Sequence, residues 1–186
     1  ILSRGYKGKR KKDLFLVRDE NKIFATPIES GDEAYLHVLN LKIPIVVSKD
    51  RVEGARFLKD KFKIDVIIMD DGFQHRGLIK DESIILIDAT NPFGGDEYLP
   101  KGRLRESLER LKEADEFIIS KSNYVNEKEI DIITARLKKY DKKISKAIFK
   151  EEYFYNMNEE KKVLSEIEDR NDIGKSTILE ALDIFF

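Results

Sequence analysis

Short apolar runs alternate with amphipathic segments along this chain, and this alternation limits the possible folds more than any other feature. The strand-like runs cover residues 13–17, 43–48, 65–69, 83–89 and 116–120. Segments with helical spacing of apolar residues cover 31–40, 52–62, 103–114 and 126–140. Several runs are apolar on both faces, as are strands of a parallel sheet covered by helices. The pattern predicts an α/β fold with flanking helices, in which the last four runs lie parallel in one sheet.

The composition bounds the size and the chemistry. The chain has 186 residues, the size of one ordinary domain, and 41% of them are apolar, enough for one core. Its 35 basic and 36 acidic residues nearly balance, which argues against a globally basic nucleic-acid-binding protein. The absence of cysteine excludes disulfides and thiolate chemistry. No run reaches the roughly 18 apolar residues of a membrane span, and the first residue, Ile1, is interpreted as a truncated start.

One apolar run ends in two adjacent carboxylates, Asp70 and Asp71, followed by Gly72. Ligands of open α/β sheets bind at the carboxyl ends of strands, and a carboxylate there can hold Mg²⁺ beside a nucleotide phosphate. The alternative is a strand that simply ends in a turn, but two acids followed by Gly-Phe-Gln-His are less ordinary. His75 taken alone is more typical of a structural histidine than of a catalytic one, and His37 is assigned to structure.

Four stretches resemble the tetraacyldisaccharide 4'-kinase family, in the order that the family has them. They are residues 2–6 (Leu-Ser-Arg-Gly-Tyr), 31–34 (Gly-Asp-Glu-Ala), 70–76 (Asp-Asp-Gly-Phe-Gln-His-Arg) and 99–106 (Leu-Pro-Lys-Gly-Arg-Leu-Arg-Glu). The third stretch is highly specific, and the similarity runs to about residue 155. The family belongs to the P-loop kinases. The resemblance therefore implies transfer of the γ-phosphoryl group of ATP, with Mg²⁺, to the 4'-hydroxyl of the lipid A disaccharide precursor.

The resemblance also implies roles for single carboxylates. Asp32 corresponds to the general base that acts on the sugar hydroxyl. Asp70 and Asp71 correspond to the carboxylates that hold Mg²⁺ and set the phosphate geometry. Without the family context, Asp32 is better interpreted as an acid that caps the start of a helix.

Other matching residues have less defined roles. Gln74 and His75 correspond to residues that shape the site, and Arg105 and Glu106 to a stretch that contributes to it. The alternative for Arg105 and Glu106 is an amphipathic helix with ordinary surface charges. The loop at residues 3–5 corresponds to one close to the nucleotide, without a chemical role.

A basic run has two interpretations. It consists of Lys7, Lys9, Arg10, Lys11 and Lys12. Such a run attracts an anionic membrane surface or a phosphosugar, but a solvated hairpin edge is the simpler explanation. The family resemblance implies a cytoplasmic protein, peripheral to the inner membrane.

Phosphoryl transfer by this machinery needs a G-x-x-x-x-G-K-[ST] loop, which in the family precedes the segment where this chain begins. Residues 1–155 do not supply it. A similar loop near the C-terminus, a candidate to bind the nucleotide, consists of Gly174, Lys175, Ser176 and Thr177. It resembles the loop of chromosome-maintenance and recombination ATPases, but Asp169 occupies the place of the first glycine.

These observations divide the chain into a partial kinase domain, 1–155, and a tail of uncertain origin, 156–186. The first hypothesis is a fragment of an ATP- and Mg²⁺-dependent lipid A 4'-kinase. The second is a module of a chromosome-maintenance ATPase, which would respond to DNA. The third is a catalytically inactive fragment. Because the loop is missing, the chain on its own is expected to be inactive.

Overall fold

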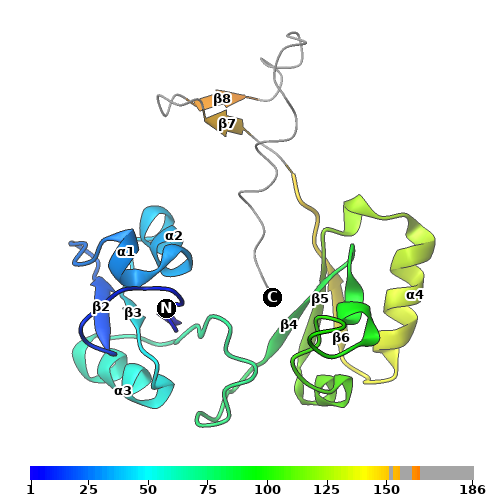
Figure 1. Cartoon of the computed structure of the whole chain (residues 1–186), viewed down its shortest axis with the longest axis horizontal. Helices are drawn as coiled ribbons and strands as arrows, with labels where there is room; N and C mark the ends of the chain where they lie inside the picture. The colour runs from blue at the N-terminus through cyan, green and yellow to red at the C-terminus, as the bar shows by residue number, and fades with distance from the viewer. Residues whose placement is uncertain (151–152, 156–160, 164–186) are drawn as a thin grey trace. The chain divides into compact units, whose positions relative to one another are not determined.

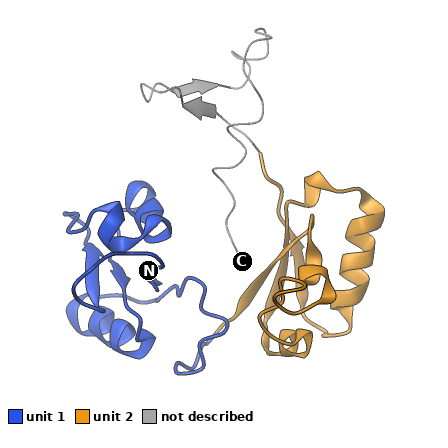
Figure 2. Ribbon diagram, viewed as in Figure 1, with its two compact units in different colours: residues 1–81 blue, residues 82–186 orange. Residues whose placement is uncertain are grey.

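The computed structural model of the chain describes residues 1–150, 153–155 and 161–163, the last two ranges as backbone strands. Figure 2 shows the two units into which the chain divides, Ile1–Asp81 (unit 1) and Glu82–Phe186 (unit 2). Their boundary falls inside the single kinase domain that the sequence predicts. Each unit has its own sheet and its own buried apolar cluster.

Unit 1 contains a three-stranded sheet with the order β1-β3-β2 (Figure 1). β1 (Leu2–Ser3) and β3 (Ile45–Val47) are parallel, and β2 (Phe15–Arg18) runs antiparallel to β3. The side chains of β3 alternate between two clusters, because Ile45 and Val47 face one side of the sheet and Val46 the other. This is the two-residue period of a strand covered on both faces.

Helices cover both faces of this sheet (Figure 1). They are α1 (Pro27–Ser30), α2 (Asp32–Asn40) and α3 (Arg51–Lys61). α2 packs Ala34 and Val38 against Ile45 and Val47, and α3 packs Leu58 against the opposite face. Asp50 caps α3 by accepting hydrogen bonds from backbone N–H groups of its first turn. The helices predicted for 31–40 and 52–62 are therefore confirmed.

The predicted strand at 65–69 is wrong in extent. Only Met69 pairs, in a parallel bridge with Leu2. The Leu2 N–H donates to the Ile68 carbonyl at 2.9 Å, and the Asp70 N–H donates to the Leu2 carbonyl at 3.0 Å. Because the neighbouring strand β1 is two residues long, it offers no partner for the rest of the run, and Val66 and Ile68 remain 76% and 63% exposed.

Unit 2 contains a second sheet, which is fully parallel and has the order β4-β5-β6. Its strands are β4 (Ile84–Asp88), β5 (Glu116–Ser120) and β6 (Lys143–Lys146). α4 (Glu127–Lys138) starts at a capping box between Asn126 and Glu129, and it packs Ile130 and Leu137 in the cluster that contains Phe117. The strands and the helix predicted here are confirmed, whereas β6, with a single apolar residue, is not predicted from the pattern.

The helix predicted for 103–114 is largely wrong. The structure has a shorter 3₁₀ helix, η2 (Leu108–Glu113), whose first turn Ser107 caps. Leu104, which fits the helical spacing, pairs instead in a parallel bridge with Tyr98. η3 (Ser122–Tyr124) is a further 3₁₀ helix, whereas η1 (Pro92–Asp96) is a tight turn in which Phe93, Gly94 and Gly95 have left-handed φ angles.

The sheet pairing confirms the α/β class and part of the predicted topology. β4 and β5 are parallel, as predicted, and β3 pairs within the sheet of unit 1. That all four runs lie in one sheet stays a prediction. Beyond unit 2's sheet, β7 (Tyr153–Tyr155) and β8 (Lys161–Val163) form an antiparallel pair.

Gly31, between α1 and α2, has a backbone conformation that suits only glycine. Its φ of 86° and ψ of 152° lie in a region that other residues almost never adopt. A Cβ atom at this position would also lie 2.3 Å from the Tyr6 carbonyl oxygen. The start of α2 therefore depends on a glycine at this position.

We expect Gly31→Ala to lower the free energy of unfolding by about 1–3 kcal/mol from backbone strain, with a further loss from the overlap. Gly95→Ala is the matched control, because Gly95 also has a positive φ of 74°, whereas a Cβ atom there would meet no atom of the described residues within 4 Å. Urea unfolding of both variants checks this. A loss at Gly31 no larger than that at Gly95 would contradict the close approach of Gly31 to Tyr6.

Candidate active site

Three parallel segments of unit 1 end at one edge of its sheet. β1 and β3 are parallel, and Met69 forms its parallel bridge with Leu2 of β1. Their carboxyl ends therefore deliver Arg4, Ser48 and Asp70 to the same edge. Ligands of open α/β sheets bind at this edge. The site of unit 1 is therefore expected there.

The start of α2 lies against the loop that leaves β1. Gly31 approaches the backbone of Tyr6 so closely that a side chain would not fit between them. Asp32, the first residue of α2, is thereby brought to the edge where β1 ends. Its side chain is exposed, and a negative charge interacts favourably with the N-terminus of a helix.

Asp70, Asp71 and Asp32 act electrostatically on Glu33, the second residue of α2. Partial burial raises the pKa of Glu33, and the negative charges of Asp70, Asp71 and Asp32 raise it further. His37, one turn along α2, acts in the opposite direction, and its Nε2 atom lies 3.8 Å from Oδ2 of Asp70. The structure thus places the start of α2, which carries Asp32, and the turn that carries Asp70 and Asp71 at the same edge, and Glu33 and His37 of α2 lie near that turn.

The sequence contains one signal for these two added residues. Glu33 and His37 are four positions apart on a helix that begins with Asp32, and this spacing places them on one face. The 3.8 Å contact with Asp70 places this histidine beside the turn, in addition to the structural assignment made from the sequence.

The buried Arg51 connects the end of β3 to residues 70–75, which are called the acidic turn below. Arg51 is only 4% exposed, and it donates to the Ser48 carbonyl at 2.7 Å and to the Asp70 carbonyl at 3.3 Å. Burial lowers the pKa of Arg51, as does the charge of Arg4, whereas Asp71 and Asp70 raise it. Arg51 therefore offsets part of the negative charge at this edge and fixes the start of the turn.

The turn after Met69 carries the predicted histidine. Asp71 has a left-handed φ of 47°, and the His75 N–H donates to the Gly72 carbonyl at 3.1 Å. The Nε2 atom of His75 is buried and has no hydrogen-bond partner in the part of the chain that the structure describes. His75 belongs to the acidic turn, and its part in catalysis stays a prediction.

The carboxylate oxygens at this edge are ligands of the kind that Mg²⁺ prefers. Asp70 and Asp71 offer adjacent carboxylates, but the described ranges contain no group of three or more His, Cys, Asp or Glu side chains that could hold a metal ion. Mg²⁺ usually takes one or two protein carboxylates and completes its shell with phosphate oxygens and water. Asp70 and Asp71 can therefore hold Mg²⁺ that keeps several waters, and phosphate oxygens of a nucleotide would replace some of that water.

The other predicted site residues belong to unit 2. There the carboxylate of Glu106 forms an ion pair with Arg110, which also binds Glu113. The side chains of Glu106 and Arg110 are only 27% and 14% exposed, and the part of Glu106 in an active site stays a prediction. Gly174, Lys175, Ser176 and Thr177 lie outside the described residues.

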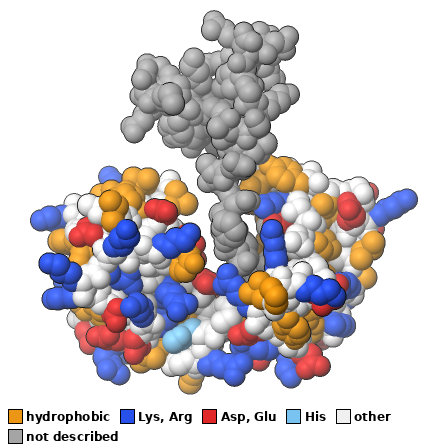
Figure 3. Space-filling model, in the orientation of Figure 1, with side chains coloured by type: hydrophobic (Ala, Val, Ile, Leu, Met, Phe, Trp, Pro, Cys, Tyr) orange, Lys and Arg blue, Asp and Glu red, His pale blue; other side chains and the backbone are white. Residues whose placement is uncertain are grey.

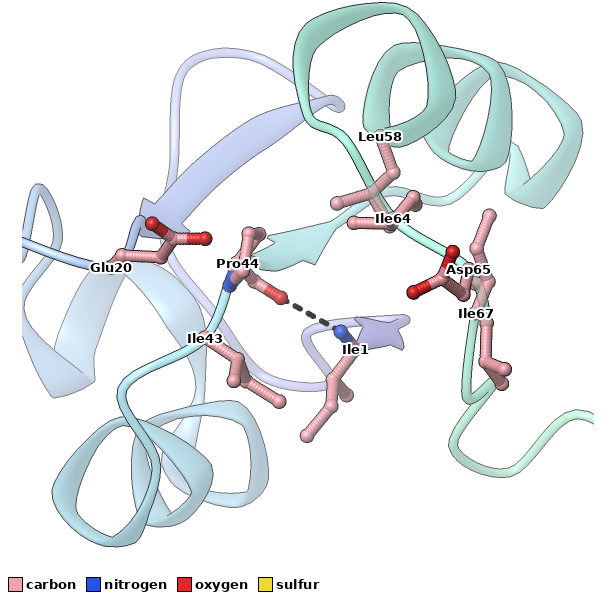
Figure 4. A pocket seen from close by; sticks show the side chains of 9 residues that line it. Ile1, Glu20, Ile43, Pro44, Leu58, Ile64, Asp65 and Ile67 are labelled. Carbon is pink, nitrogen blue, oxygen red and sulfur yellow. Dashed lines mark hydrogen bonds between the residues drawn. The ribbon is translucent and has the colours of Figure 1, made fainter.

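A hollow of about 350 Å³ lies at the other edge of the unit 1 sheet (Figure 4). Its lining includes Ile1, Pro44 and Ile67, which precede the paired residues of the three parallel segments. The amino nitrogen of Ile1 donates to the Pro44 carbonyl at 2.7 Å. Most of the lining is apolar, and it includes none of the predicted site residues. The candidate site is therefore the acidic edge.

The predicted basic run contributes partly to the fold. Arg10 donates to the carbonyl oxygens of Gly5 and Arg4 at 2.9 Å each, and so holds the loop that leaves β1. The four lysines of the run are exposed. On the face shown in Figure 3, basic and acidic side chains are interspersed.

Comparisons with known proteins agree with the resemblance. A sequence model of the tetraacyldisaccharide-1-P 4'-kinase family matches residues 1–171. The match thus continues past residue 155, where the sequence resemblance was expected to end, and it stops before Gly174.

Individual relatives carry the same name. The chain is 36% identical to the tetraacyldisaccharide 4'-kinase of Elusimicrobium minutum, over 84% of this chain and 43% of that protein. It is 40% identical to that of Chlorobium luteolum, over 74% and 39%. The Aquifex aeolicus crystal structure described as "apo" form LpxK in complex with ATP is 38% identical, with a TM-score of 0.58 over 63% of this chain and 37% of that one. The chain spans about two fifths of the length of these relatives.

We expect Glu33→Gln to stabilise the chain at neutral pH more than in acid. Because the fold raises the pKa of Glu33, the folded state keeps this proton longer than the unfolded state does. The contribution of Glu33 to stability therefore falls as the pH rises from the ordinary pKa of 4.5 through the raised one. The amide side chain carries no charge at any pH. Thermal unfolding at several pH values should therefore show a gain in stability that develops as the pH rises through this window and is complete above it.

Glu53→Gln is the matched control, because Glu53 occupies the first turn of α3 as Glu33 does that of α2. The control should show no pH-dependent gain. A Glu33→Gln variant whose stability follows the wild-type pH profile would contradict the crowding of carboxylates.

Proposed function

This chain belongs to the tetraacyldisaccharide-1-P 4'-kinase family, and we propose that it carries the acidic part of the active site of a lipid A 4'-kinase. The proposed reaction moves the γ-phosphoryl group of ATP to the 4'-hydroxyl of the tetraacylated disaccharide precursor of lipid A. The observation that best supports it is that Asp70 follows the segment paired with β1, while α2, which begins at Asp32, approaches it through His37, 3.8 Å from the Asp70 carboxylate.

Asp32 is the proposed general base. It is the exposed first residue of α2, so its carboxylate is accessible to an incoming sugar hydroxyl. In the proposed step the carboxylate accepts the proton of the 4'-hydroxyl while that oxygen bonds to the γ-phosphorus. The bond from the γ-phosphorus to the bridging oxygen breaks, and ADP leaves with its electron pair.

Asp70 and Asp71 are the proposed ligands of Mg²⁺, which when bound neutralises charge on the phosphates. Arg51 supports them, because its hydrogen bond to the Asp70 carbonyl fixes the first residue of the turn relative to β3. His37 approaches the Asp70 carboxylate from α2, the helix that carries Asp32. The base and the metal ligands are thus connected through one helix and one turn.

A phosphate-binding loop would have to complete this site. Since the chain spans about two fifths of its relatives' length, we propose that sequence outside this chain supplies the loop. The motif at 174–177 is a poor substitute, because it follows the end of the family match and has Asp169 where a glycine permits the turn. The alternative function as a chromosome-maintenance ATPase rests on this motif alone.

The proposed substrate also sets the proposed location. A tetraacylated lipid lies in a membrane, so the kinase would act at the cytoplasmic face of the inner membrane. None of the helices that the structure describes is long and apolar enough to span a bilayer. The exposed lysines at positions 7, 9, 11 and 12 are suited to contact with anionic headgroups at such a surface.

A segment exchange tests the proposed function. Residues 1–155 of this chain would replace the matching stretch of the Elusimicrobium minutum relative, which contributes the remaining sequence. We expect the hybrid to transfer phosphate from Mg-ATP to the tetraacyldisaccharide 1-phosphate. Asp32→Asn in the hybrid should lower kcat by roughly 10²–10⁴ with little change in ATP affinity, because the amide cannot accept the proton.

Glu33→Gln in the same hybrid is the control, because it removes the neighbouring charge and leaves the proposed base in place. Its kcat should fall much less than that of Asp32→Asn. A folded hybrid that binds ATP but transfers no phosphate, or one in which Asp32→Asn is fully active, would overturn the proposed function.

The chain on its own should not bind Mg-ATP tightly. A phosphate cradle needs successive backbone N–H groups in a glycine-rich turn, and the tail motif has Asp169 at its first glycine. Isothermal titration of the purified chain with Mg-ATP, in parallel with Lys175→Ala, measures this. Micromolar binding that disappears in Lys175→Ala would contradict the prediction and favour the ATPase hypothesis.

A further inference from the structure

A single lysine binds three carbonyl oxygens of the acidic turn. The Nζ atom of Lys80 lies 3.2 Å from the Gly72 oxygen, 3.2 Å from the Phe73 oxygen and 2.9 Å from the His75 oxygen. A lysine ammonium has three N–H donors. Lys80 can therefore donate one hydrogen bond to each of these carbonyls.

Hydropathy favours an exposed Lys80 and a buried Ile79, whereas the structure has the reverse. The side chain of Lys80 is partly buried, whereas the adjacent Ile79 is 100% exposed. An apolar side chain would normally take the inner position and a lysine the outer one. The polar contacts of the ammonium, and not apolar burial, therefore determine how the segment after His75 folds back on the turn.

Lys80 and Arg51 together hold most of the turn's carbonyl groups. Arg51 binds the Asp70 oxygen, and Lys80 binds those of Gly72, Phe73 and His75. Arg51 binds the carbonyl group that precedes Asp71, and Lys80 binds carbonyl groups that follow it. The backbone that carries Asp70 and Asp71 is therefore held on both sides of Asp71.

We propose that Lys80 is a positioning residue, whose ammonium holds the turn so that Asp70 and Asp71 converge on one divalent cation. This role rests on the proposed function, in which these two carboxylates bind Mg²⁺. The sign of a charge effect separates positioning from electrostatics. Removal of a cation near a metal site should by itself strengthen metal binding, whereas loss of the carboxylate geometry should weaken it.

Lys80→Met tests the proposal, because methionine keeps the length of the stem and removes the donors. The measurement is the affinity of the purified 186-residue chain for Mn²⁺, read from the free Mn²⁺ signal in electron paramagnetic resonance. We expect Lys80→Met to bind Mn²⁺ at least about tenfold more weakly, and Lys80→Arg, which keeps a cationic donor, to recover part of the loss. Lys42→Met removes the same charge before β3, at the other end of the strand, and should bind like the wild type.

Two further measurements keep the outcomes distinct. Amide hydrogen exchange at residues 71–76 should accelerate in Lys80→Met at a temperature where thermal unfolding shows the variant to be folded. Mn²⁺ binding by folded Lys80→Met that equals or exceeds that of the wild type would overturn the positioning role. If Asp70→Asn with Asp71→Asn leaves Mn²⁺ binding unchanged, the proposed metal site fails. If, in addition, Lys80→Met leaves amide exchange in the turn unchanged, then Lys80 does not hold the turn either.

Discussion

The parallel pairing of β1 with β3, extended by the bridge between Leu2 and Met69, is the constraint on which the candidate site depends. Parallel neighbours end at the same edge, so the residues that follow them are delivered together. A parallel pair also needs a crossover, and α1 and α2 lie within the segment between β1 and β3. The crossover returns Asp32 to the edge where β1 ends, because Gly31 packs directly on Tyr6.

Acidic side chains share this edge, and two cationic side chains bind the backbone of the turn that carries Asp70 and Asp71. Burial raises the pKa of Glu33 most, and the charges of Asp70, Asp71 and Asp32 raise it further. Arg51 and Lys80 bind backbone carbonyls of the turn, so the hydrogen bonds that fix them do not depend on the ionisation of those acids. Such an arrangement keeps negative charge concentrated where a nucleotide-bound cation would lie.

The hydrophobic periodicity predicted the elements that pack into a core of their own. It failed where backbone pairing with a neighbouring segment determines whether a strand forms. The run at 43–48 alternates between two buried clusters and is β3, whereas the equally apolar run at 65–69 lacks a neighbour of sufficient length. Leu104 fits a helix but pairs with Tyr98. Among the site residues, the motif around Asp70 could be recognised from the sequence. Lys80 could not, because bonds from a side chain to carbonyl oxygens leave no pattern of residue types.

Paramagnetic broadening tests whether α2 and the acidic turn converge at one edge of the sheet. Mn²⁺ at low occupancy would be added to the ¹⁵N-labelled chain, and the amide signals would be followed by two-dimensional NMR. We expect selective broadening at Asp32 and Glu33 together with Asp70 and Asp71, and none near the hollow lined by Pro44. Broadening of the turn without broadening at the start of α2 would contradict this convergence.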